Sequence, residues 1–564
     1  MSLPDTHTAL QNGKTAAAPS VLLDKLLLAA ALAILFLSAN QLSYAPKQGI
    51  HTIVHVAPAD ALISLVALLI ALPYLEQARW GRVISWVILA VEGAAVVALS
   101  NKGHDFMSVV HHGGGSAHLK SAAASAVLVI LMVWQVVRLF RSGGQEIPMP
   151  ALPAPVWALF VVALLSAITM ILPSESLHDW LHTPESKDAI RKGVLFLVEL
   201  FQQLGIALFV FLAVLRTPGR TRLAVRALLF GVFICMLVAL PQYVHFALHP
   251  AELTPQQLAA RSMTTDHTGP LVEGLMQSRK AYGGLLCLAL PLALGCLLGS
   301  RRRIIRIGYA AFIGLALITT LSGAAFWCAL IGLAVTGLCA RTREARVFAL
   351  GCILFGLLIA AALPWNRSHV VREFFTIHTA PAPGLATPGA TTAAPASRVL
   401  KKEYVEWIAG VYMTGEHFWL GVGPGQYQLN IGQYYGEDPN PAVRLERDSN
   451  NLYLVYAASI GFAGLIALLQ LILSAVRRSW TASRQAPAAN AHGASSTLAE
   501  WWRSCEGSAL SAGGCGALAA FLIINLFTSL LIRGVGVVFA FLIALAWISS
   551  RGAVSQSSSK GSSQ

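Results

Sequence analysis

Long apolar runs alternate with short polar segments along almost the whole chain. Each run approaches the roughly 20 residues that an α-helix needs to cross a bilayer. Lipid leaves backbone groups without partners, so only helices or closed barrels span it, and continuous apolar runs favour helices. The pattern predicts an all-α, polytopic membrane helix bundle of about 14 transmembrane helices. The expected spans are 21–43, 59–77, 82–100, 120–140, 152–172, 192–215, 223–243, 282–299, 304–321, 324–340, 347–364, 451–475, 509–530 and 534–549.

Composition agrees with a membrane location, since 56% of the 564 residues are hydrophobic and only 12% are charged. The first run is too long for a signal-peptide core, and no clear small-residue cleavage site follows it. We therefore expect a retained helix there. The eight cysteines lie mostly within apolar runs and none lies in the large outer loops, which argues against a disulfide framework.

Basic residues gather in alternate loops, such as those at 301–306 and 341–346. If the N-terminus is cytoplasmic, every inner loop carries Lys or Arg, as the positive-inside rule requires. An even number of spans then places both termini in the cytoplasm. The net charge of +14 is dispersed among these short loops and forms no single basic face, which argues against a nucleic-acid partner.

Polar segments divide the chain into four parts. A histidine-rich loop at 104–120 could hold a metal, but its spacing matches no metal motif, and a flexible polar loop is favoured. No metal and no cofactor is predicted. The parts are 1–243, N-terminal transmembrane helices; 244–364, central transmembrane helices with an outer loop at 244–281; 365–450, a large outer loop; and 451–564, C-terminal transmembrane helices and a cytoplasmic tail.

The loop at 365–450 has two parts. Its centre, 378–397, is rich in Ala, Pro, Thr and Gly and should be extended and mobile. The rest predicts a helix at 399–415 and a glycine-rich turn, GVGPGQY, at 421–427. Glycines in this turn allow left-handed torsions, so its N–H groups could face an anion, or the turn could simply join two helices. The loop ends with ERDSNN at 446–451, directly before an apolar run.

The order of these features resembles the O-antigen ligase and O-antigen polymerase superfamily of bacterial inner-membrane glycosyltransferases. The resemblance covers mainly residues 270–475. In that family the large loop carries an Arg and Trp helix, a glycine-rich segment, and an H-N-x-Y/L-L element leading into G-x-x-G-x-x-x-x-L. The matching residues here are Trp407, Leu420 to Gly425, Asn451 to Leu454, and Gly461 to Leu465.

The resemblance implies a multi-pass protein of the bacterial inner membrane, with the 365–450 loop in the periplasm. Its partners would be a polyprenyl-diphosphate-linked glycan, an acceptor glycan or lipid, and membrane lipids. Transfer of the glycan to an acceptor hydroxyl develops negative charge on the departing diphosphate and releases a proton. Such a site needs fixed cations and one proton acceptor.

Cationic side chains on the outer side could hold the diphosphate, a task for which the planar arginine fork is well suited. Arg279 should lie near the bilayer surface, where the diphosphate must be, and is the predicted catalytic cation. Each of these cations could instead reach to lipid phosphates. The candidate substrate-binding residues are Lys280, Arg398, Lys401, Lys402, Arg444, Arg447, Asn450 and Asn451.

Asp448 is the predicted catalytic base, with Glu446 and His417 as reserves. Its alternative role is to cap the helix that begins near Asn451. Asn450 stands where the family has its histidine, and an amide does not titrate.

LSGAAFW at 321–327 also lacks an arginine that the family carries after the preceding span. The missing histidine slightly favours a polymerase or a divergent ligase. A transporter or flippase is the alternative from another class, although acidic residues inside spans, such as Glu92 and Glu199, are few. A catalytically inactive family member is the third interpretation.

Overall fold

The computed structural model describes residues 21–39, 62–67, 69–70, 151–169, 184–248, 275–276, 279–300, 302–320, 323–340, 343–362, 402–434, 451–484, 498–531 and 535–561. All regular secondary structure in these ranges is helical, which confirms the all-α part of the predicted fold class. The elements are α1 (Val21–Ala39), α6 (Ala154–Ile168), α8 (Pro184–Leu200), η1 (Phe201–Ile206), α9 (Ala207–Val214), α10 (Pro218–Leu248), α12 (Arg279–Gly299), α13 (Arg303–Thr319), α14 (Gly323–Cys339), α15 (Arg343–Ala362), α18 (Lys402–Glu416), α19 (Tyr427–Asn430), η3 (Ile431–Tyr434), α21 (Leu452–Arg484), α22 (Leu498–Ile524) and α23 (Val535–Gly561).

Several of these helices are apolar enough to cross a membrane, and all of them coincide with predicted spans. The predicted spans 82–100 and 120–140, like the histidine-rich loop at 104–120, lie outside the described residues. The total of about 14 spans therefore stays a prediction. Five helices qualify by length and composition: Lys192–Val214, Gly219–Val244, Lys280–Gly299, Leu452–Arg484 and Gly507–Ile524. The shorter apolar helices are Ala154–Ile168, Ala324–Cys339, Arg346–Ile359 and Val535–Ser550.

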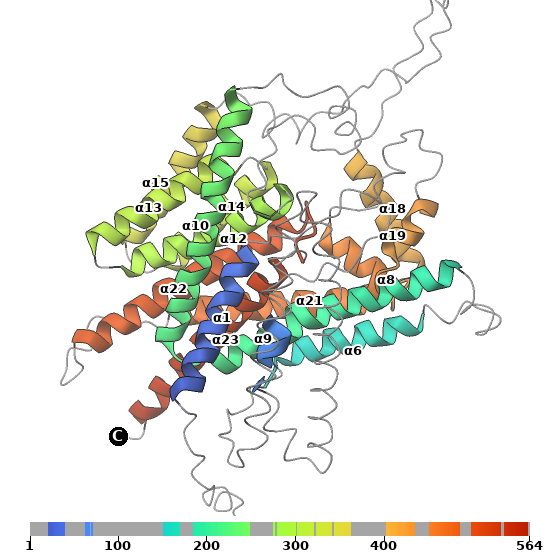
Figure 1. Cartoon of the computed structure of the whole chain (residues 1–564), viewed down its shortest axis with the longest axis horizontal. Coiled ribbons are helices and arrows are strands. Elements are labelled where there is room, and N and C mark those ends of the chain that lie inside the picture. The colour runs from blue at the N-terminus through green and yellow to red at the C-terminus, as the bar shows by residue number, and fades with distance from the viewer. Residues whose placement is uncertain are drawn as a thin grey trace, which may run out of the picture.

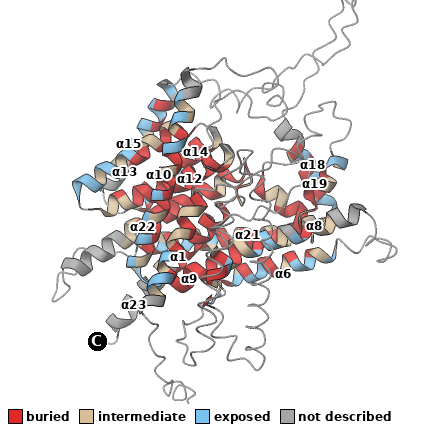
Figure 2. Ribbon diagram, viewed as in Figure 1, coloured by how far each residue is buried: buried red, intermediate tan, exposed pale blue. Residues whose placement is uncertain are grey.

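Helix α12 forms the centre of the molecule and is buried continuously over residues 281–295. It packs against α22, α14 and α13, and buried residues line these contacts (Figure 2). Small residues let α12 and α22 approach closely, as is common between membrane helices. A methyl group added to Gly295 would lie 2.7 Å from the Ala509 carbonyl oxygen. One added to Gly513 would lie 2.7 Å from that of Pro291.

The N-terminal helices enclose this centre on one side. Helix α1 packs along α10, and Asp24 forms an ion pair with Arg220 that joins the two. The helices α8, η1 and α9 continue one another from Pro184 to Val214, with η1 as a wider π-helical segment. Helix α6 packs against α8, η1 and α21.

The helices α18 and α19 lie on the opposite side from α10, α13 and α15 (Figure 1). Helix α18 corresponds to the predicted helix at 399–415 and packs against α21. The segment that follows α18 returns to a kink within α21, and this junction is the starting point for the candidate site.

Candidate active site

A break in α21 at Gly461 shapes the site. Gly461 has φ 77° and ψ 176°, a backbone conformation that essentially only glycine adopts. The break removes helical partners from the carbonyls of Ala458 and Ser459 and from the N–H of Phe462. Unpaired backbone groups are costly inside a membrane protein, so these groups need partners elsewhere.

The glycine turn, defined here as residues 417–426, supplies those partners. The N–H groups of Val422 and Gly423 donate to the carbonyls of Ala458 (2.8 Å) and Ser459 (2.9 Å). In return, the Phe462 N–H donates to the Phe418 carbonyl at 2.7 Å. The prediction that the turn's N–H groups face an anion is therefore wrong for Val422 and Gly423, and the turn joins two helices instead.

Gly421, Gly423 and Gly425 all have positive φ, which confirms the predicted left-handed torsions. Gly421 also has no room for a side chain, because an added methyl group would lie 2.5 Å from the Ala458 carbonyl oxygen. The spacing of these glycines thus reflects backbone packing against α21.

The helices α6 and α8 hold the turn from the other side. The Ser166 hydroxyl lies 2.5 Å from the Leu420 carbonyl oxygen and 3.0 Å from that of Ser459 and donates to them. The Gln426 side-chain amide donates to the Ala189 carbonyl at 2.6 Å. Neither contact could be predicted from the sequence, because α6 and α8 carry no motif that points to the turn.

We expect Ser166→Ala to lower the free energy of unfolding by about 0.5–1.5 kcal/mol, because it removes the hydroxyl that donates to the carbonyls of Leu420 and Ser459. The measurement is thermal unfolding of the detergent-solubilised protein. Thr481→Ala is the control, since the Thr481 hydroxyl is exposed and bonds only the Arg477 carbonyl of its own helix. An equal loss in both variants would show that Ser166 does not clamp the turn.

Helix α18 has a buried face and an exposed apolar face. On the buried face, Ala409 and Met413 pack with residues of the turn and of α21. On the other face, Ile408, Val411 and Tyr412 are 48%, 58% and 66% exposed. A helix with exposed apolar residues beside transmembrane helices is typical of the membrane interface.

Tyr434 closes the end of this unit. Its hydroxyl donates to the Glu416 carboxylate at 2.7 Å and links η3 to α18. Loss of hydration and the neighbouring Glu416 raise the pKa of Tyr434 to about 12. Tyr434 therefore stays protonated at neutral pH and keeps donating this hydrogen bond.

Glu406 is a buried carboxylate of α18 that the sequence analysis missed. It is fully buried. A helical spacing of three and seven residues places it on the same face as Ala409 and Met413, and this spacing is the signal that could have identified it. A completely buried carboxylate in a polar loop segment is a candidate functional group.

Asn451 caps α21. Its side-chain oxygen accepts the N–H groups of Tyr453 (3.0 Å) and Leu454 (3.2 Å), and the residue is buried. The capping role that the sequence offered to Asp448 thus belongs to Asn451. The start of α21 is also tied to α22, because the Leu452 N–H donates to the Asn525 carbonyl at 3.0 Å.

The end of α22 and the residues after it, 522–530, contact three helix ends. We call them the α22 exit segment. The ring centroids of Phe527 and Trp407, the latter on α18, lie 6.3 Å apart. A methyl group added to Gly284 near the start of α12 would lie 2.5 Å from the Leu530 side chain. Together with the bond from Leu452, these contacts bring the starts of α12, α18 and α21 around one segment.

Two predicted cations begin helices at this junction. Arg279 is the first residue of α12 and Lys402 the first residue of α18. Each lies five positions, or about 7.5 Å along its helix, before the residue of that helix that contacts the exit segment. Lys280 is half-buried in the first turn of α12. The predicted site residues Arg398, Lys401, Arg444, Arg447, Asp448 and Asn450 lie outside the described residues.

A comparison with protein families matches residues 308–469 to the model described as O-antigen ligase. The match begins in α13 and ends in α21 beyond the Gly461 break, so it includes α18 and the glycine turn. The start of α12, the exit segment and the residues of α6 and α8 that hold the turn lie outside it. No curated protein matches the chain. Residues 308–469 thus match an O-antigen ligase domain, which supports membership of the O-antigen ligase and polymerase superfamily.

Proposed function

We propose that the protein is an integral-membrane glycosyltransferase that uses a polyprenyl-diphosphate-linked glycan at the periplasmic face of the bacterial inner membrane. It would act as an O-antigen or exopolysaccharide polymerase or as a ligase. The observation that supports this most strongly is the meeting of three helix starts around the α22 exit segment. Two of them begin with a predicted cation, and the third follows the ERDSNN motif.

In the proposed reaction an acceptor hydroxyl attacks the anomeric carbon of the lipid-linked glycan. A new glycosidic C–O bond forms while the bond from that carbon to the diphosphate oxygen breaks. The polyprenyl diphosphate leaves with the bonding electrons, and the hydroxyl proton passes to Asp448. Charge grows on the diphosphate as it departs, so cations held in place lower the barrier more than they stabilise the bound substrate.

Arg279 is the proposed catalytic cation, because an arginine binds phosphate oxygens in pairs and stays charged at any relevant pH. Asn451 already caps α21, so contact with the substrate would be a second role for its side chain. The amides of Asn450 and Asn451 are suited to sugar hydroxyls. The other proposed diphosphate ligands are Lys280, Arg398, Lys401, Lys402, Arg444 and Arg447.

The exposed apolar face of α18 supports a location at the membrane surface. Trp419, in the glycine turn, is 72% exposed, and tryptophan is enriched where hydrocarbon meets water. A site at this level lets the isoprenoid stay in lipid while its diphosphate reaches protein side chains. With an even number of spans, both termini would be cytoplasmic.

The test compares lipid-linked glycans extracted from cells with and without the protein, with re-expression from a plasmid as the control. Accumulation of the single-unit polyprenyl-diphosphate glycan on the periplasmic face means a polymerase. Long chains left on the carrier mean a ligase. We expect one of these two results, and the absence of the histidine at Asn450 favours the first. Single units confined to the cytoplasmic face would support a flippase instead, and unchanged pools would contradict any transfer activity.

A further inference from the structure

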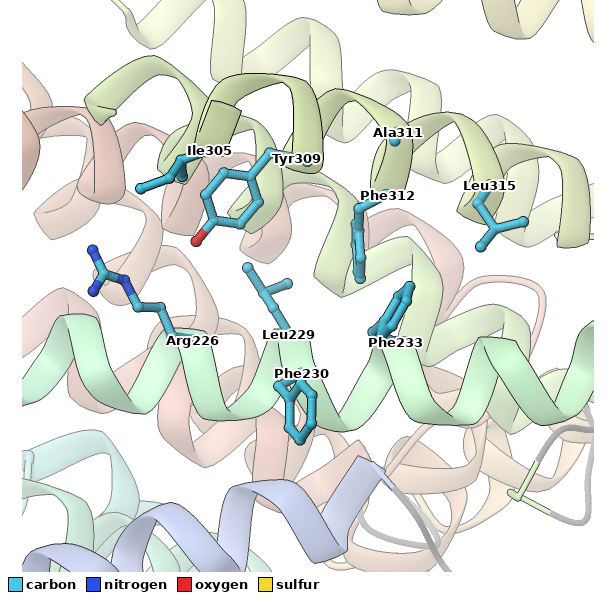
Figure 3. A pocket seen from close by; sticks show the side chains of 10 residues that line it. Arg226, Leu229, Phe230, Phe233, Ile305, Tyr309, Ala311, Phe312 and Leu315 are labelled. Carbon is cyan, nitrogen blue, oxygen red and sulfur yellow. The ribbon is translucent and has the colours of Figure 1, made fainter. Parts of the chain in front are cut away.

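A groove between α10 and α13 lies away from the glycine turn and has no part in the proposed reaction (Figure 3). Its volume is about 530 Å³. Among the described residues, its lining contains one charged side chain, that of Arg226, and no carboxylate.

The walls of the groove are apolar. Leu229 and Phe233 of α10 face Phe312 of α13 across it (Figure 3). Phe230 also lines the groove and stacks on Phe36 of α1. Gly308 widens it, because a methyl group added there would meet no atom within 4 Å. The groove is too small for another helix. A helix about 10 Å wide would fill 530 Å³ with little more than one turn.

One end of the groove is basic. In Figure 3 the Arg226 guanidinium reaches toward Tyr309, and it interacts with the Tyr309 hydroxyl. Arg302, Arg303 and Arg306 stand at the start of α13, near Ile305 in the sequence, and add positive charge at this end of the helix without lining the groove. Arg220, by contrast, is neutralised by its ion pair with Asp24.

This basic end lies near the end of a span. Arg226 follows Gly219, where the apolar part of α10 begins, by seven residues, or about 10 Å of helix. The arginines at 302–306 lie at the start of α13, on the side that the charge pattern predicts to be cytoplasmic. The cytoplasmic leaflet carries anionic lipids, and basic pockets between transmembrane helices on this side bind their phosphate groups.

We propose that this groove binds an anionic phospholipid of the cytoplasmic leaflet. An acyl chain would lie along Leu229, Phe233 and Phe312, and the phosphate would lie beside Arg226. A soluble phosphate would use only the basic end, whereas the lipid uses both the charge and the apolar walls. The proposal does not depend on glycosyl transfer.

The test is native mass spectrometry of the full-length protein, released from detergent with phosphatidylglycerol or phosphatidylcholine. We expect the wild type to retain phosphatidylglycerol at least tenfold more than phosphatidylcholine. Arg226→Gln should abolish this preference, and Gly308→Leu, which fills the groove, should reduce the binding of both lipids. Gly351→Leu is the matched control, because Gly351 of α15 also has open space around it but lies outside the groove.

Unchanged phosphatidylglycerol retention in both groove variants would overturn the proposal, as would equal retention of the two lipids by the wild type. Displacement of bound lipid by millimolar inorganic phosphate would indicate a plain anion site and would also overturn it. If the wild type is a dimer that Gly308→Leu dissociates, a second copy of the chain fills the groove instead. Arg226→Gln keeps the test decisive if Gly308→Leu fails to fold.

Discussion

Gly461→Ala should prevent the accumulation of folded protein. A β-carbon at Gly461 would overlap the carbonyl group of Trp419 and the backbone nitrogen of Leu420. All of these are backbone atoms, so no side chain can turn aside to make room. The left-handed torsion adds strain of about 1–3 kcal/mol for any residue other than glycine.

Relieving the overlap would separate the glycine turn from α21. The three backbone hydrogen bonds between them would then be lost, each worth about 1 kcal/mol. The total is a large part of the roughly 5–15 kcal/mol that stabilises a folded protein. We expect at least a fivefold lower amount in the membrane fraction, measured by immunoblot and by gel filtration in detergent.

Gly415→Ala is the matched control, since Gly415 of α18 has no atom within 4 Å of the added methyl group. It should accumulate as the wild type does. If Gly461→Ala also accumulates normally and elutes as a single folded species, the junction between the turn and α21 does not require a glycine at position 461.

The glycine turn illustrates what the local sequence could predict. Closely spaced glycines indicate left-handed torsions, and those torsions are present at Gly421, Gly423 and Gly425. The partners of the turn could not be predicted, because Ser166 and Ala189 lie more than 200 positions away in the sequence. The break at Gly461 was equally hidden. A single glycine in an apolar run usually continues the helix, and only the approach of the Trp419 backbone requires the break.

The candidate site divides in the same way. The charged and amide residues at 444–451 drew attention to the start of α21, and a helix begins there as expected. The α22 exit segment carries no charge, and its sequence predicts only the end of a span. Its importance comes from what touches it, including Trp407 and Leu452. Contacts between distant segments of this kind leave no periodic signal in a sequence.

Asp448→Asn should abolish glycan transfer while leaving the amount of inserted protein unchanged. If Asp448 takes the proton from the acceptor hydroxyl, an amide in its place cannot do so. The loss of a general base typically lowers the rate by about 10²–10⁴-fold. The fold should survive, because the N-cap of α21 is Asn451, three residues further on. The measurement is transfer of glycan from polyprenyl diphosphate to acceptor by the purified protein in lipid vesicles.

Two matched variants decide which carboxylate acts as the base. Glu446→Gln makes the same chemical change two residues away and should retain most of the activity. Glu406→Gln tests the buried carboxylate of α18, whose position near Trp407 makes it the strongest rival to Asp448. If Asp448→Asn transfers glycan at the wild-type rate and Glu406→Gln does not, the proton passes to α18. The base would then lie on the helix whose start contacts the exit segment, and the polar motif before α21 would serve only to bind substrate.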